Sequence, residues 1–217
     1  MRARVWLLLT VIVGLILPLI GIAISYNPKD VPRAADVSMN GVYLSSGRTA
    51  RKILKKPSFI CDMELYGDGK DLDRDPVSSH GGHPCYYNQD RTEILGAFYS
   101  HGAYIDDFQM DEFQVRPVLM KTSPKIPVLK QIKHFKSGRG IHLGMTPVQV
   151  KEILGTQCLR TDNKEGLYVM EYSLADYGQP CGGAKAKRFA GIYGYYSTYI
   201  FKKGLLVLFD FGFGLDV

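Results

Sequence analysis

Two neighbouring stretches of the chain carry side chains that could bind a metal ion. The first reads GDGKDLDRDP, and its alternating aspartates could bring several carboxylate oxygens to one hard cation such as calcium. The EF-hand pattern is not met, because Pro76 and Gly82 stand where that loop needs its sharp-turn glycine and its bidentate glutamate. We interpret the stretch as a solvated acidic loop and leave a weak calcium site open. Its aspartates are Asp68, Asp71, Asp73 and Asp75.

The second stretch, SHGGHPC, places His80, His83 and Cys85 at spacings that zinc ligands use. A tetrahedral zinc site needs a thiolate and a fourth ligand, and an oxidised Cys85 supplies no thiolate. We therefore expect a turn here and predict no bound metal or cofactor. The sequence also contains no nucleophile-elbow motif and no glycine-rich phosphate loop, so we predict that the protein is not an enzyme. The alternative is a small-ligand or metal-dependent envelope enzyme that uses residues 68–85.

An aromatic stretch near the C-terminus is the best candidate for a binding surface. If residues 192–201 form a strand, alternate residues point to one face of the sheet. Tyrosine-rich surfaces are favoured anchors in protein interfaces, so this face is predicted to bind another protein if it is open. In the alternative, another segment of the chain covers the face internally. The predicted binding residues are Tyr193, Tyr195, Tyr199 and Phe201.

The N-terminus carries a membrane-targeting segment. Arg2 and Arg4 precede residues 5–25, which contain no charged side chain and are long enough to span a bilayer. Length favours a retained anchor facing the periplasm, whereas Pro18 and the small residues near Ser25 favour cleavage after Ser25 and release into the periplasm. Either way, the rest of the chain is predicted to lie outside the cytoplasm. The net charge of +6 includes the two flanking arginines, so no nucleic-acid partner is expected.

The clearest predicted element is a short helix over residues 146–154. Thr146 is suited to cap it, Pro147 to its first turn and Gln149 to the other half of a capping box, while Gly155 provides the stop. Residues 26–40 have the composition of a linker. Strands are predicted at residues 167–174, 192–201 and 205–211, the last two joined by a short turn that favours a hairpin.

Matches between the two halves of the chain suggest a tandem repeat. The stretches at Gly41 and Gly140, and the Ile-Leu pairs at Ile53 and Ile153, recur in the same order with an offset near 100 residues. We therefore predict an α+β protein of two related units, residues 41–115 and 140–217, joined by residues 116–139. Each unit would pack a short helix on its own antiparallel sheet. The cysteines recur at matching places and would pair within the units, Cys61 with Cys85 and Cys158 with Cys181.

The sequence GIHLGMTPVQVKEILG at residues 140–155 resembles the helix signature of the SmpA/OmlA, or BamE-like, outer-membrane assembly lipoprotein family. A tandem of such units with one disulfide each is similar to the β-lactamase-inhibitor protein fold. The chain departs from the lipoprotein pattern because no cysteine stands in or just after the apolar segment. Together these patterns predict a cell-envelope protein, attached through residues 5–25 or released, that binds another protein or envelope component through a sheet face.

Overall fold

The computed structural model of the chain describes residues 31–44, 60–61, 83–101, 108–118, 126–174, 181, 189 and 194–213. The predicted anchor, the start of the predicted linker and the predicted first helix near Ile53 lie outside these ranges. Within the described ranges, no helix has the length and apolar character that a membrane crossing requires.

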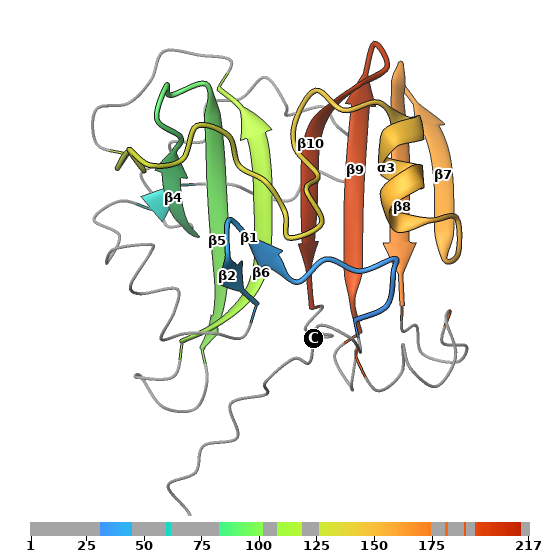
Figure 1. Cartoon of the computed structure of the whole chain (residues 1–217), viewed down its shortest axis with the longest axis horizontal. Helices are drawn as coiled ribbons and strands as arrows, with labels where there is room; N and C mark the ends of the chain where they lie inside the picture. The colour runs from blue at the N-terminus through green and yellow to red at the C-terminus, as the bar shows by residue number, and fades with distance from the viewer. Residues whose placement is uncertain are drawn as a thin grey trace, which may run out of the picture.

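One antiparallel sheet of eight strands dominates the fold (Figure 1). Its spatial order is β3-β4-β5-β6-β10-β9-β8-β7, and a separate small hairpin is made by β1 and β2. The hairpin strands are β1 (Ser38–Met39) and β2 (Val42–Tyr43). The first four sheet strands in the chain are β3 (Ile60–Cys61), β4 (His83–Tyr87), β5 (Glu93–His101) and β6 (Phe108–Pro117). The other four are β7 (Leu159–Lys164), β8 (Leu167–Ser173), β9 (Tyr196–Lys202) and β10 (Leu205–Gly212).

The two halves of the chain meet in the middle of the sheet. The last strand of each half, β6 and β10, pair with each other, with Val115 opposite Phe209 and Phe113 opposite Phe211. Each of these strands would otherwise present an unpaired edge of backbone N–H and C=O groups, so pairing them satisfies both edges at once. The sheet is therefore continuous across the two halves.

This architecture corrects the predicted fold class. We expected an α+β protein in which each of two units packs a short helix on its own sheet. The protein is instead mostly β, with one continuous sheet and, in the described part of the chain, a single short helix. The expectation failed because periodicity along the chain predicts individual strands, whereas the joining of β6 to β10 depends on pairing between distant residues.

The single helix, α3 (Pro147–Leu154), forms as its end signals predict. The Thr146 hydroxyl accepts a hydrogen bond from the Gln149 backbone N–H (3.4 Å), and the Gln149 side chain accepts one from the Thr146 backbone N–H (2.8 Å). Gly155 ends the helix with a φ of 79° and donates its N–H to the Lys151 carbonyl. Arg33 donates to the carbonyl of Ile153 (3.1 Å), which ties the N-terminal segment to the helix end.

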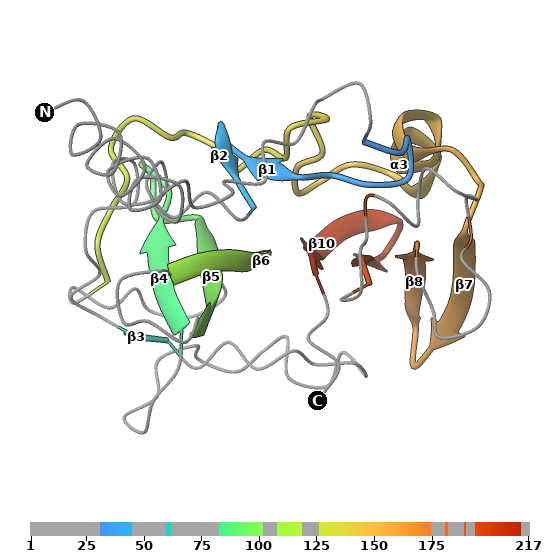
Figure 2. The ribbon, with the colours of Figure 1, turned by 90° about the horizontal axis from the view of Figure 1, so that it is seen from below.

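Residues 31–40, which we expected to belong to a linker, are part of the fold. Ala35 and Met39 are buried, and Met39 forms an isolated β-bridge to Ser137. Together with α3 and residues 129–145, they lie on one side of the sheet (Figure 2). We call this side of the sheet the helix face. Buried aromatic side chains fill the space beneath these segments: Tyr86, Phe113, Phe135, Tyr172, Tyr195, Tyr199, Phe201, Phe209 and Phe211.

The second half of the sheet is built from two tight hairpins. Lys203 and Gly204 connect β9 to β10 with φ angles of 53° and 77°, and this hairpin confirms the predicted turn. Glu165 and Gly166 connect β7 to β8 in the same way, with φ angles of 51° and 81°. Positive φ at both positions is typical of type I′ turns, whose twist matches that of paired strands. The polar strand β7 was missed by the sequence analysis.

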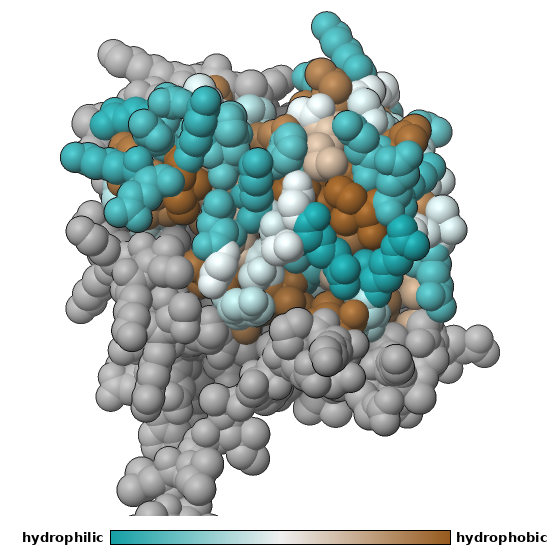
Figure 3. All heavy atoms as spheres, viewed as in Figure 1, coloured by the Kyte–Doolittle hydropathy of each residue, from teal (hydrophilic) through white to brown (hydrophobic). Residues whose placement is uncertain are grey.

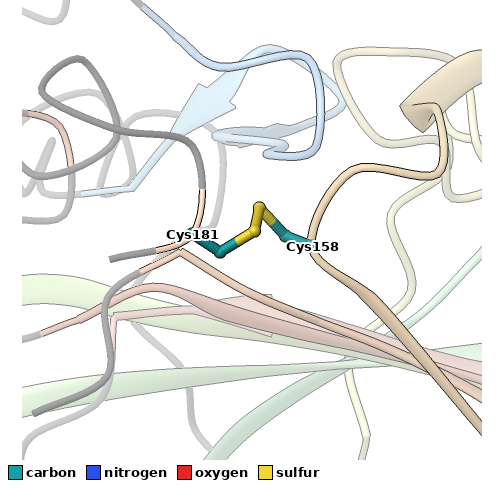
Figure 4. Close-up of a disulfide and its surroundings, with 2 residues drawn as sticks. All are labelled: Cys158 and Cys181. Carbon is teal, nitrogen blue, oxygen red and sulfur yellow. A yellow bond between two sulfur atoms is a disulfide. The ribbon is translucent and has the colours of Figure 1, made fainter. Parts of the chain in front are cut away.

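The predicted disulfide between Cys158 and Cys181 is confirmed (Figure 4). It joins the start of the β7 strand to the segment that follows β8, with the two Cα atoms 5.5 Å apart. Cys85 is also disulfide-bonded. The antiparallel pairing of β3 with β4 places Cys61 opposite His83, two residues from Cys85. Because the Cys61 side chain is outside the described part of the structure, its pairing with Cys85 stays a prediction, which peptide mapping without reductant can test.

Candidate functional site

The aromatic residues that the sequence predicted as an open binding surface belong to the core. Tyr199 and Phe201 on β9, and Tyr195 just before this strand, point to the helix face and are at most 1% exposed, while Tyr193 lies outside the described residues. Tyr199 stacks on Phe209 and meets Tyr172 edge to face. The prediction of an open aromatic surface is therefore corrected, and the alternative of internal cover is favoured.

The cover was hard to foresee because the segments that provide it have no regular sequence pattern. The Tyr195 hydroxyl accepts a hydrogen bond from the backbone N–H of Asp36 (2.7 Å), so the N-terminal segment closes directly over this strand. Burial also raises the pKa of the Tyr195 hydroxyl, with the neighbouring Asp36 charge as a second cause. The phenol is a structural acceptor for the covering segment.

The stretches with possible metal ligands fall mostly outside the described residues. Asp68, Asp71, Asp73, Asp75 and His80 are not described, and neither is the His83 side chain. Among the residues that the structure does describe, no group of three or more His, Cys, Asp or Glu side chains is placed to hold a metal ion.

The face of the sheet opposite α3, here called the polar face, carries a row of aligned residues with polar side chains on five of six strands. Strand pairing aligns one residue from each of six neighbouring strands. Burial is deepest at the centre, where Gln114 and Asp210 are 1% and 3% exposed, and both Glu171 and Arg160 at the outer end are exposed. In order across the sheet, the polar row is Gly96, Gln114, Asp210, Thr198, Glu171 and Arg160.

A second contact crosses the central seam beside this row. Glu112 on β6 lies opposite Gly212 on β10, which lies opposite Tyr196 on β9. Because Gly212 has no side chain, the Tyr196 ring can reach over the middle strand, and its hydroxyl donates a hydrogen bond to Glu112 Oε2. The contact therefore connects three strands through two side chains and links the two halves of the chain.

The central acids make this part of the polar face electrostatically unusual. Burial raises the pKa of Asp210 well above its ordinary value of 3.8, and the nearby Glu112 and Glu171 charges raise it further. Hydrogen bonds from Thr198 oppose the shift, including one from its backbone N–H to Asp210 Oδ1 (3.1 Å). Burial and the Glu112 charge also raise the pKa of Tyr196, which keeps this hydroxyl protonated as a donor.

Gln114 adds a buried side-chain donor without a hydrogen bond to the same row. Its side-chain amide nitrogen is buried and has no hydrogen-bond partner in the described structure. Most buried polar groups in folded proteins are bonded, because leaving one unbonded costs about 1–3 kcal/mol. The polar row therefore contains a donor that folding leaves unsatisfied.

Buried acids on the helix face are used differently. Asp36 accepts backbone N–H groups from Val37 (3.0 Å) and Arg139 (3.1 Å). Glu93 accepts the Phe135 backbone N–H (2.7 Å) and contacts His134 Nδ1 (2.8 Å). These carboxyl groups fix the covering segments, so we assign them a structural role.

The polar row was not predicted, although the sequence of two strands contains a signal for it. Within β6, Glu112, Gln114 and Arg116 alternate with apolar residues, and Asp210 interrupts the apolar run of β10. Charged residues are seldom buried, so a charged residue inside an apolar strand indicates that one face of the sheet is polar at that position. Only strand pairing shows that these residues lie side by side.

Comparison with known proteins finds no family model, curated protein or solved structure that matches the chain. The resemblance to BamE-like proteins therefore stays an expectation drawn from residues 140–155.

Proposed function

We propose that this protein is a non-enzymatic binding protein of the cell envelope that holds another protein or envelope component on the polar face of its sheet. The observation that carries this proposal is the polar row itself, which runs from the buried Gln114 and Asp210 outward to the exposed Glu171 and Arg160. A partner that covers the outer strands would extend this row with its own hydrogen-bonding groups. The proposal includes no nucleic-acid partner and no cofactor.

The exposed end of the row is suited to binding because its two charged side chains form no ion pair with each other. Arg160 and Glu171 are directly opposite each other on β7 and β8, yet no ion pair joins them in the described structure. Both side chains can therefore pair with charges on a partner. Charged groups of this kind contribute more to specificity and association rate than to raw affinity.

A location outside the cytoplasm is the second part of the proposal. The Cys158–Cys181 disulfide and the bonded state of Cys85 support it, because such bonds persist in oxidising compartments. The uncharged stretch at residues 5–25 would keep the protein at the membrane facing the periplasm, or direct its release there after cleavage.

The test uses a charge swap that leaves the net charge unchanged. Full-length protein carrying Arg160→Glu and Glu171→Lys is compared with wild type in crosslinked pull-downs from envelope extract. The matched control carries Glu152→Lys and Lys203→Glu, two exposed positions away from the polar row. We expect a partner that wild type and control recover equally, and that the row variant recovers at least tenfold less.

Equal recovery by all three proteins would contradict the assignment of the polar row. Far-ultraviolet circular dichroism and urea melts of each variant show whether a loss of recovery comes from unfolding. Unfolding is not expected, because surface substitutions usually change the free energy of unfolding by within about 0.5 kcal/mol.

A further inference from the structure

A second surface with a different chemistry lies on the other side of the molecule. Residues 129–139 cross the first half of the sheet on its helix face (Figure 1). Phe135 points inward and is fully buried, while three exposed lysines follow one another at intervals of three residues from Lys130 to Lys136. We call this set the lysine ridge; it consists of Lys130, Lys133 and Lys136. Hydrophilic side chains cover this part of the molecule in Figure 3.

The ridge has a fixed backbone although it is not a regular helix or strand. Hydrogen bonds to the rest of the fold hold its backbone at residues 129, 132, 133 and 136, so the segment cannot turn its lysines inward without breaking them. The bonds are Leu129 N–H to the Tyr87 carbonyl (2.8 Å), Gln89 N–H to the Ile132 carbonyl (2.7 Å), Asn88 Nδ2 to the Lys133 carbonyl (2.7 Å) and Asn40 N–H to the Lys136 carbonyl (2.9 Å).

The positive charge of the ridge is not neutralised within the described structure. Two buried acids bond to this segment: Glu93 has its two oxygens engaged by the Phe135 N–H and by His134, and Asp36 accepts the Arg139 N–H. On the neighbouring turn, Asp90 is followed by Arg91, so that pair adds no net charge. Within the described residues, none of the three ridge lysines forms an ion pair. The segment therefore holds three uncompensated cations outward.

An exposed aromatic residue lies on the hairpin beside the ridge. Tyr43 on β2 is 42% exposed, and the same hairpin is bonded to the ridge through Asn40 and Lys136. Tyrosine is an amphipathic side chain that favours the boundary between water and lipid headgroups. Lysines beside it would lie at the level of the headgroup phosphates.

We propose that the lysine ridge docks this domain on an anionic lipid surface. Lysine ammonium groups are compact point charges that need no fixed partner geometry, whereas protein hot spots favour tryptophan, tyrosine and arginine in packed pockets. A ridge of lysines without a groove fits a diffuse layer of phosphates better than one shaped protein partner. Each lysine near such a surface strengthens binding about fivefold.

This docking would also set the orientation of the molecule. The ridge and the polar row lie on opposite faces of one sheet, so a membrane under the ridge leaves the polar row directed away from the lipid. The proposal does not depend on the partner-binding function, since it rests on different residues and can fail separately.

The experiment measures lysine acetylation in full-length protein reconstituted into vesicles. One set contains phosphatidylcholine alone, and the other contains phosphatidylcholine mixed with phosphatidylglycerol. We expect Lys136 to react about fivefold more slowly in the anionic vesicles and to recover at high salt, which screens the attraction. Lys202 at the end of β9 and Lys203 in the turn that follows are exposed; they are internal references and should react equally in both.

Variants then test whether the ridge acts as a unit. Lys130→Gln with Lys133→Gln should abolish the protection of Lys136, because two lysines together account for roughly 25-fold in binding. The matched variant, Lys202→Gln with Lys203→Gln, should leave that protection intact. Equal Lys136 reactivity in neutral and anionic vesicles, or protection that survives the ridge variant, would overturn the proposal. Protection by polyglutamate in neutral vesicles that equals protection by anionic lipid would also overturn it, in favour of an acidic protein.

Discussion

The two faces of the central sheet use the same kinds of side chain for different purposes. On the helix face, aromatic rings pack against one another, and the carboxyl groups of Asp36 and Glu93 accept backbone N–H groups of the covering segments. On the polar face, Glu112 accepts a side-chain hydroxyl, and Asp210 lies within its electrostatic influence. The carboxyl groups of the helix face therefore hold the covering segments in place. Those of the polar face lie close to one another, so their negative charges repel.

The contrast within a single strand is the clearest. Tyr196 and Tyr199 are three residues apart on β9 and belong to opposite faces. Tyr199 is fully buried among aromatic rings, while Tyr196 reaches across the seam to a carboxylate. The position of a tyrosine along this strand thus decides which face it lies on, and so whether it belongs to the core or to a polar contact. We infer that the packed rings of the helix face stabilise the fold. The buried acids and the unbonded amide of the polar face do not contribute to stability in this way, which fits a role in binding.

The strongest way to break this comparison is to remove a core ring. Tyr199→Ala should lower the free energy of unfolding by roughly 3–5 kcal/mol, because it opens a cavity among packed aromatic rings. Urea melts measure the change. Leu205→Ala is the control and should cost little, since Leu205 is 49% exposed. A loss below about 1 kcal/mol at Tyr199 would mean that the helix face is not the stabilising face.

A smaller effect is expected from the hydroxyl that crosses the seam. Tyr196→Phe keeps the ring but removes the donor to Glu112, and should cost about 2 kcal/mol because a buried carboxylate loses a hydrogen bond. Adding Glu112→Gln should recover part of this loss, since the neutral amide needs the donor less. A double-mutant cycle of urea melts gives the coupling. Strictly additive losses would show that the two side chains do not interact.

The acid at the centre of the polar row should make stability depend on pH. Because the pKa of Asp210 is raised above 3.8, the folded state binds a proton more tightly than the unfolded state. Its contribution is therefore present at acid pH and is lost as pH rises above the unfolded pKa. Asp210→Asn cannot ionise, so its stability relative to wild type should rise by roughly 1 kcal/mol or more from about pH 4 to about pH 8.

Urea melts across this pH range check the prediction, with Asp162→Asn as a control of opposite sign. The pKa of Asp162 is lowered, chiefly by its hydrogen bond with Lys164, so the Asp162 contribution is present at neutral pH and is lost on acidification. A relative stability of Asp210→Asn that does not change with pH would show that Asp210 titrates normally in the folded protein.

The smallest effect belongs to the helix cap. Thr146→Ala should cost about 1 kcal/mol through loss of the capping box, wherever the helix packs. Leu154→Ala provides the comparison and should cost roughly 2–5 kcal/mol, because Leu154 is one of the buried residues of α3. Ile153, which the sequence suggested as a core position, is only partly buried and should cost less than Leu154. The opposite order of these two residues would place the wrong side of α3 against the sheet.

Features that depend on residues close together in the sequence were predicted more successfully than features that depend on distant residues. The capping box at Thr146 and Gln149 and the hairpin turn at Lys203 and Gly204 involve residues within four positions, and both formed as expected. The Cys158–Cys181 pairing was also correct, and it had been predicted from cysteines that recur at matching places in the two halves of the chain. The strand β7 was missed because its polar residues lack the apolar alternation that marks a half-buried strand.

The amino-acid sequence by itself therefore determined the local elements of this protein: the ends of α3, the tight turns, several strands and one disulfide. Only the tertiary structure decided that β6 pairs with β10, that residues 31–44 and 129–145 cover Tyr195 and Tyr199, and that Gln114 and Asp210 lie side by side. The physical reason is that caps and turns depend on neighbours along the chain. Sheet faces depend on the register between strands that are about 100 residues apart in the chain, and a one-residue slip would exchange them.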